Sequence, residues 1–90
     1  ERIELAEGAS LVQIESPESF HNMTLAQLHL RKTYRVNVVA IRRTMEEILD
    51  GQTITKQFVI SVPAGDTAIK KGDILILIGT DDAIENLPAN

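Results

Sequence analysis

The side chains of this sequence best suited to hold an anionic ligand lie close together, between residues 31 and 37. They are Arg31, Lys32, Arg35 and Asn37, with Tyr34 among them. An arginine guanidinium offers a planar pair of donors that fits phosphate or carboxylate, and an asparagine amide can hydrogen-bond a base or ribose edge. A plainer interpretation stays open. Cations are favoured at helix C-termini, and Asn37 can simply begin a strand.

Residues that could carry catalysis or bind a metal are scattered. The glycines stand at positions 8, 51, 65, 72 and 79, so no glycine-rich phosphate loop is present. His21 and His29 do not have a metal-ligand spacing. Aspartates 66, 73, 81 and 82 each stand beside a glycine or at an expected helix start, where turn and capping chemistry explains them. No serine has a histidine partner in a strand-turn-helix context. We therefore predict no catalytic residue, no metal site and a protein that is not an enzyme.

Composition limits the classes of protein to which this chain can belong. It has 90 residues, 43% of them hydrophobic, which fits one globular domain. The net charge is −4 and aromatic residues are few, which argues against nucleic acid as a partner. Without cysteine there are no disulfides, which fits a reducing compartment. Its apolar runs are too short to span a membrane. Because it begins at Glu1 without a methionine, we expect residues 1–90 to be a single domain cut from a larger protein.

A helix and a strand must position the anion-binding candidates. Thr24 and Gln27 have the spacing of a capping box, which predicts a helix over residues 25–32. Residues 36–41 are β-branched and nearly all apolar, which predicts a strand buried on both faces. The candidate cations therefore lie where the helix gives way to the strand.

Three further strands are expected, over residues 10–15, 58–62 and 74–78, and the last should also be buried on both faces. Residues 44–51 allow two structures. A second capping box could begin a short helix that ends at Gly51, or Asp50-Gly51 could turn a hairpin between two strands. We favour the hairpin.

Thr80 is placed to cap a final helix, with two aspartates in its first turn. The predicted fold is α+β, a small mixed β-sheet with two short helices.

Two segments together resemble the RCK C-terminal (TrkA-C) domain family. Residues 22–43 read N-M-T-L-A-Q-L-H-L-R-K-T-Y-R-V-N-V-V-A-I-R-R, similar to the family pattern G-K-T-L-x-E-L-x-L-R-x-x-Y-G-V-x-V-V-A-I-x-R. Residues 66–79 match D-T-x-I-x-x-G-D-x-L-x-x-x-G, and the resemblance covers about residues 5–87. The chain departs from the pattern at Asn22-Met23 in place of Gly-Lys, at Arg35 in place of a glycine that tolerates positive φ, and in a longer stretch over residues 44–60.

The resemblance implies a regulatory domain that pairs as a homodimer and acts on potassium transport or other membrane transport. Its partner would be a membrane transporter or channel subunit, in the same chain or another, at the cytoplasmic face of the membrane. Some members of the family act instead on transcription regulators.

The resemblance also implies a regulatory ligand in place of a resident cofactor. Some members bind cyclic di-AMP between protomers, and the matching residues here are Arg31 for phosphate and Asn37 for adenine, with Val36 and Val38 as apolar walls. Other members bind metal cations or have no known ligand. The alternative functions are a constitutive dimerisation module with no small-molecule ligand, or the sensor domain of a different transporter or of a transcription regulator.

Overall fold

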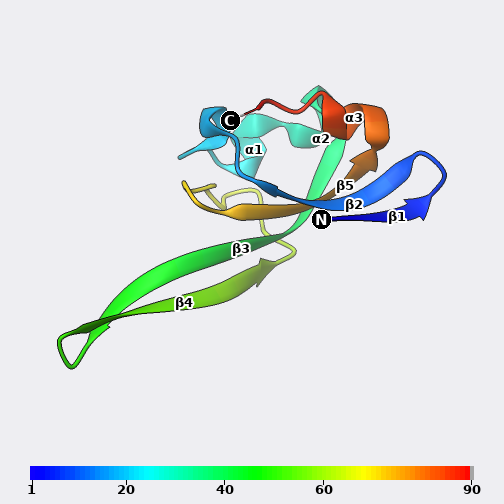
Figure 1. Ribbon diagram of the computed structural model, residues 1–90. Helices are drawn as coiled ribbons and strands as arrows, with labels where there is room; N and C mark the ends of the chain where they lie inside the picture. Colours follow the sequence, from blue (N-terminus) through cyan, green and yellow to red (C-terminus); the bar gives the residue numbers. More distant parts are fainter. Residues whose placement is uncertain (90) are drawn as a thin grey trace.

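Five strands form a single antiparallel sheet in the computed structural model, which describes residues 1–89 (Figure 1). The strand order is β1-β2-β5-β3-β4, and every neighbouring pair is antiparallel. The strands are β1 Arg2–Ala6, β2 Ala9–Glu15, β3 Val36–Leu49, β4 Gln52–Ser61 and β5 Ile74–Thr80. The predicted α+β class is confirmed, but the sheet is wholly antiparallel, not mixed. Strand β1 was not predicted.

Short helices gather on one side of this sheet (Figure 1). They are the 3-10 turn η1 Glu18–Phe20 and the α-helices α1 Leu25–Leu28, α2 Leu30–Thr33 and α3 Asp81–Glu85. The Thr24 capping box is confirmed, with both of its hydrogen bonds present, and Thr80 accepts a bond from Ala83 N at the start of α3. There are therefore three short α-helices where two were predicted.

The predicted helix over residues 25–32 is broken at His29. This residue is left-handed, with φ 48°, and it separates α1 from α2. A continuous helix would place Leu28 and Leu30 about 200° apart around its axis. Both leucines are buried. The break turns both side chains toward the same core, and that burial offsets the cost of a left-handed histidine.

The hydrophobic core lies between the helices and one face of the sheet. Strand β5 shows this asymmetry. Leu75 and Leu77 are 0% and 1% exposed, whereas Ile74, Ile76 and Ile78 are only partly buried. The expectation that β3 and β5 are buried on both faces is wrong, because an antiparallel sheet needs cover on one face only. The core residues are Val12, Phe20, Leu28, Leu30, Val36, Ile41, Ile69, Leu75, Leu77, Ala83 and Ile84.

The hairpin of β3 and β4 extends far beyond the rest of the sheet (Figure 1). Asp50 and Gly51 turn it, both with positive φ (51° and 77°) as a tight hairpin turn requires. The predicted hairpin is confirmed, and its strands are longer than expected, at 14 and 10 residues. Pairing of β3 with β5 ends at Arg42, so residues 43–58 form a two-stranded ribbon, here called the arm. Among the described residues, no helix is long and apolar enough to cross a membrane.

Candidate functional site

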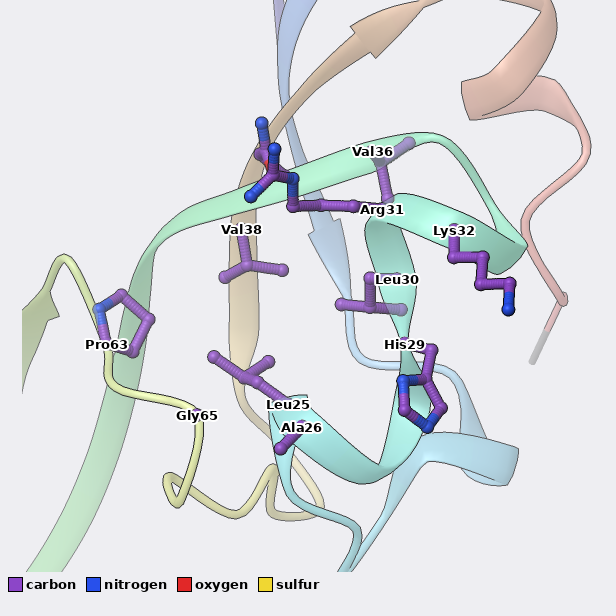
Figure 2. A pocket seen from close by; sticks show the side chains of 11 residues that line it. Leu25, Ala26, His29, Leu30, Arg31, Lys32, Val36, Val38, Pro63 and Gly65 are labelled. Atoms are coloured by element: carbon purple, nitrogen blue, oxygen red, sulfur yellow. The ribbon is translucent and has the colours of Figure 1, made fainter.

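A groove of about 470 Å³ lies between the α1–α2 segment, the start of β3 and the loop after β4. Figure 2 shows Leu25, Leu30 and Val38 converging on the groove, while Arg31 extends across it toward β3. Its lining residues are Leu25, Ala26, His29, Leu30, Arg31, Lys32, Val36, Asn37, Val38, Pro63 and Gly65. The four residues predicted for a ligand site, Arg31, Val36, Asn37 and Val38, are all in this set.

The predicted residues do not all present their side chains in the same direction. Val36 is buried at 2% exposure and Val38 packs against the core. Successive strand residues point to opposite faces. Asn37 therefore leaves β3 on the other face, where its register partner on β5 is Ile78, and it is exposed. We place Asn37 at the rim of the groove and the two valines on its floor.

One wall of the groove is an open strand edge. Residues 36–38 of β3 pair with β5 on one side, whereas pairing with β4 begins only at Ala40. Beyond that point the chain after β4 turns away, and Pro63 and Gly65 enter the groove from the loop. The opening exists because β4 is too short to cover the start of β3.

The N-terminus of α1 borders the groove, but its amides are already occupied. Leu25 N donates to Thr67 O at 3.0 Å, and Ala26 N donates to Gly65 O at 2.9 Å. The next amide, that of Gln27, donates to the hydroxyl of its capping threonine at 3.1 Å. An anion in the groove must therefore be held by side chains, not by the helix end.

Charge in the groove is positive, although the whole chain carries −4. Arg31 and Lys32 line it, and no aspartate or glutamate does. Both cations are exposed, and neither forms an ion pair with any of residues 1–89. An arginine held at an apolar groove without a protein carboxylate can offer its donor fork to a phosphate.

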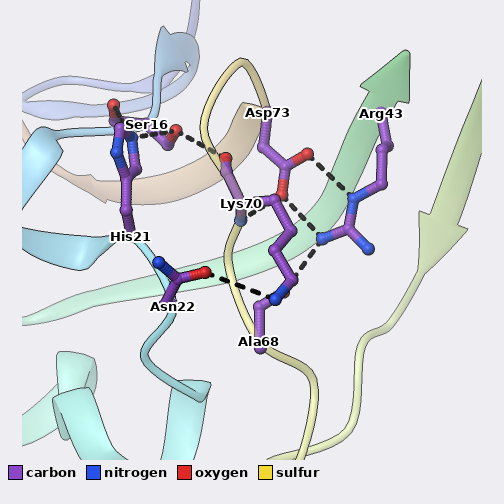
Figure 3. Close-up of polar contacts among 7 residues, drawn as sticks. All are labelled: Ser16, His21, Asn22, Arg43, Ala68, Lys70 and Asp73. Carbon is purple, nitrogen blue, oxygen red and sulfur yellow. Dashed lines mark hydrogen bonds and ion pairs between the residues drawn. The ribbon is translucent and has the colours of Figure 1, made fainter. Parts of the chain in front are cut away.

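A buried ion pair fixes the loop that forms the far wall (Figure 3). Arg43 donates to both carboxylate oxygens of Asp73, at 2.9 and 2.7 Å, and to the carbonyl of Ala68 at 2.9 Å. The same carboxylate accepts from Lys70 N at 2.8 Å. The sequence suggested only a turn role for Asp73. This residue, 1% exposed, has a further role. It joins the loop to β3.

One serine does have a histidine neighbour, contrary to expectation. Ser16 Oγ lies 3.1 Å from His21 Nε2 and donates to Lys70 O at 3.1 Å. The same Nε2 is 3.2 Å from Ser16 O, so it is placed to donate. Because Ser16 is 1% exposed and lines neither described cavity, this contact holds two loops together and presents no nucleophile.

A second hollow, of about 520 Å³, lies between the end of α2 and α3, and it mixes both signs of charge. Arg35 and Asp82 both line it, so an anion would be attracted to it less strongly than to the first groove. Its lining is Thr33, Tyr34, Arg35, Thr80, Asp82, Ala83 and Asn86. No group of three or more potential metal ligands occurs among residues 1–89.

Sequence reasoning missed half of the groove. Leu25 and Ala26 lie in the predicted helix, and Pro63 follows the predicted strand over residues 58–62, but none of the three is predicted to line a site. Gly65 reaches the groove because the loop crosses the start of α1, a contact between residues about 40 positions apart. Nothing local in the sequence signals that crossing.

The chain is similar to potassium transport proteins. The TrkA-C domain model matches residues 9–88. The Ktr system potassium uptake protein C of Bacillus subtilis (strain 168) is 36% identical over 78 residues, which cover 87% of this chain but 30% of that protein. The chain thus spans less than a third of this curated relative.

Solved structures agree with the fold. The RCK C domain of the potassium transport protein KtrA, in complex with cyclic di-AMP, superimposes with a TM-score of 0.65 at 27% identity, covering 90% of this chain and 81% of that one. The GsuK RCK domain gives a TM-score of 0.62 at 26% identity, covering 88% and 15%. A GsuK channel bound to NAD gives 0.62 at 25% identity, covering 88% and 13%.

Proposed function

Because this chain belongs to the TrkA-C domain family, we propose that it is the regulatory, non-catalytic domain of a potassium transport protein. In this role it acts at the cytoplasmic face of the membrane, on a transporter or channel subunit. The support is the likeness to a potassium uptake protein and to RCK domains of potassium transport proteins.

We further propose that the groove binds cyclic di-AMP between two copies of the chain. One observation carries this proposal. Arg31, which forms no ion pair with residues 1–89, lies at an apolar groove that no acidic side chain lines. The ligand is two-fold symmetric, with two phosphates and two adenines, so the same groove of each protomer can meet one half of it. The relative KtrA RCK C domain has been solved with this ligand.

Each groove residue then has a role. The Arg31 guanidinium binds a phosphate, and the apolar floor of Leu25, Val36 and Val38 packs against a base. Asn37, at the rim, hydrogen-bonds an adenine edge. A ligand shared by two protomers favours the orientation that it fits, and this difference in affinity is the regulatory free energy available to the transport protein.

Calorimetry with cyclic di-AMP on the whole chain tests the proposal. We expect one ligand per two chains, and Arg31→Ala should weaken binding by about 10- to 100-fold, the value of a charge-assisted hydrogen bond lost to phosphate. Arg35→Ala is the matched control. It removes another exposed cation, four residues away, that lines the other hollow, and it should leave binding unchanged.

Two results would contradict this assignment. Equal weakening by both variants would mean that general positive charge, not the groove, attracts the ligand. No heat with the unsubstituted chain, and no shift in its melting temperature, would favour the constitutive dimerisation module with no small-molecule ligand.

A further inference from the structure

The arm has two unlike faces. Alternation along the ribbon places Met45, Glu47 and Leu49 of β3 on one face, together with the β4 residues opposite them. The same alternation adds Arg43 and its partner Phe58. This set, here called the arm face, comprises Arg43, Met45, Glu47, Leu49, Gln52, Ile54, Lys56 and Phe58, and it continues the core face of the sheet beyond Ile41 and Ile60. The opposite face is mainly polar, with threonines 44, 53 and 55, Glu46 and Gln57, and with Ile48 near the tip.

Three apolar side chains of the arm face are open to solvent in the described residues of the single chain. Met45, Leu49 and Phe58 are 49%, 53% and 39% exposed. No third strand or helix backs the ribbon among the described residues, since β5 pairing ends at Arg42. A lone two-stranded hairpin is marginally stable in water, and contiguous exposed apolar patches mark interaction surfaces.

The exposed surface area of the chain indicates how much surface a partner would bury. A compact 9.9 kDa monomer exposes about 5,200 Å², whereas this chain exposes 6121 Å². Its radius of gyration is 14.3 Å, against about 12 Å for a compact domain of this length. The excess of about 900 Å² matches what each partner buries in a standard protein interface, about 800 Å².

The charges of the arm face indicate which molecule packs against it. Arg43 is already paired with Asp73. The other ionised groups of the arm face are Glu47 and Lys56, whose side-chain charges lie 3.0 Å apart and are 42% and 60% exposed. One charge of each sign makes the face self-complementary under a two-fold axis, because each copy offers an acid to the other's base. We propose that the arm face packs against the arm face of a second copy of this chain, with Glu47 of each copy meeting Lys56 of the other.

This inference shares with the proposed function only the choice of a second copy as partner. The groove residues and the arm residues do not overlap. Arm pairing requires no ligand, so the two proposals can fail separately. Association measured without nucleotide tests the arm, and cyclic di-AMP binding tests the groove.

Sedimentation of the whole chain over a range of concentrations is the first measurement. The unsubstituted chain should dimerise. The double variant Met45→Gln with Leu49→Gln should weaken dimerisation by about tenfold or more, because each dimer loses four buried apolar side chains. Ile48→Gln is the control. It removes a side chain that is even more exposed, at 79%, from the other face and should change nothing. Circular dichroism and thermal melts confirm that the variants fold.

Mixing experiments test the charge pairing independently of folding. Glu47→Lys and Lys56→Glu chains should each associate poorly alone, since each presents two like charges. Mixed together, they should form a heterodimer. A monomeric unsubstituted chain at every concentration, a glutamine double variant as dimeric as the unsubstituted chain, or no heterodimer on mixing would each overturn arm pairing. Cyclic di-AMP binding at one per two chains would then still support the groove alone.

Discussion

Replacing Arg43 with methionine should destabilise the domain more than any other single polar change in the described residues. Methionine keeps much of the side-chain length and apolar stem but removes all three hydrogen bonds that Arg43 donates. The carboxylate of Asp73 would remain buried, at 1% exposure, with only Lys70 N as a partner.

The loss of stability follows from the buried Asp73 carboxylate, which would no longer have a cation beside it. Breaking a buried ion pair by removing one partner costs about 3–5 kcal/mol. The lower end applies here, because the Arg43 side chain is still 22% exposed. A domain of this size has about 5–13 kcal/mol of total stability. A loss of about 3 kcal/mol is therefore a large fraction, and it should lower the melting temperature by about 12 °C or more.

Chemical denaturation of three variants measures the effect. Arg43→Met should lose about 3 kcal/mol, and Arg43→Met with Asp73→Asn should recover at least about 1 kcal/mol, because no buried charge remains and the asparagine oxygen can still accept from Lys70 N. An Arg43→Met chain within about 1 kcal/mol of the unsubstituted protein would refute the reasoning. So would a double variant that is less stable than the single one.

Ionisation of Arg43 should not change with pH near neutrality. It should therefore add no pH dependence there to the difference in unfolding free energy between the Arg43→Met and unsubstituted proteins. The hydrogen bonds that Arg43 donates to Asp73 raise the pKa of Arg43, an effect that outweighs the lowering by burial. A cation with a raised folded-state pKa contributes stability that is complete below its unfolded pKa and is lost only as pH rises through the folded value. For arginine that window lies far above neutral pH.

Three further substitutions test local features by chemical denaturation. Gly79→Ala would place a Cβ 2.8 Å from Val36 Cγ1, so we expect a loss of about 1–3 kcal/mol; an unchanged midpoint would show that the strands separate easily there. Thr24→Ala removes the capping bond to Gln27 N and should cost about 1 kcal/mol, and no loss would mean that the loop alone secures α1. Arg35→Gly should gain up to about 1 kcal/mol, because Arg35 has φ 59°; destabilisation would show that the arginine side chain offsets its strain.

Features encoded by neighbouring residues could be predicted from the sequence. The capping box at Thr24, the cap at Thr80 and the turn at Asp50-Gly51 each depend on residues within three positions of one another, and all are present. At position 35, where the family pattern has glycine, the sequence left the backbone conformation open, and Arg35 keeps the positive φ that a glycine tolerates.

Features that depend on distant contacts could not be predicted. The break at His29 serves a core assembled from strands elsewhere in the chain. The pairing of Arg43 with Asp73 joins residues 30 positions apart. Only the part of the groove that is formed by one continuous segment could be predicted. Arg31 to Val38 form a continuous segment with a recognisable pattern, whereas Pro63 and Gly65 arrive by way of the arm.

Strand β3 runs without interruption from the groove into the arm. Its first residues line the groove and its last ones reach the arm tip, with no loop between them. The register with β5 shifts between Val38 and Ala40, leaving Val39 as an extra residue, and such bulges are where strands bend. From Val39 to Leu49 the strand is about 33 Å long. A bend of about 5° at Val39 would move the tip by about 3 Å, so a small displacement of β3 at the groove would become a larger one at the arm tip.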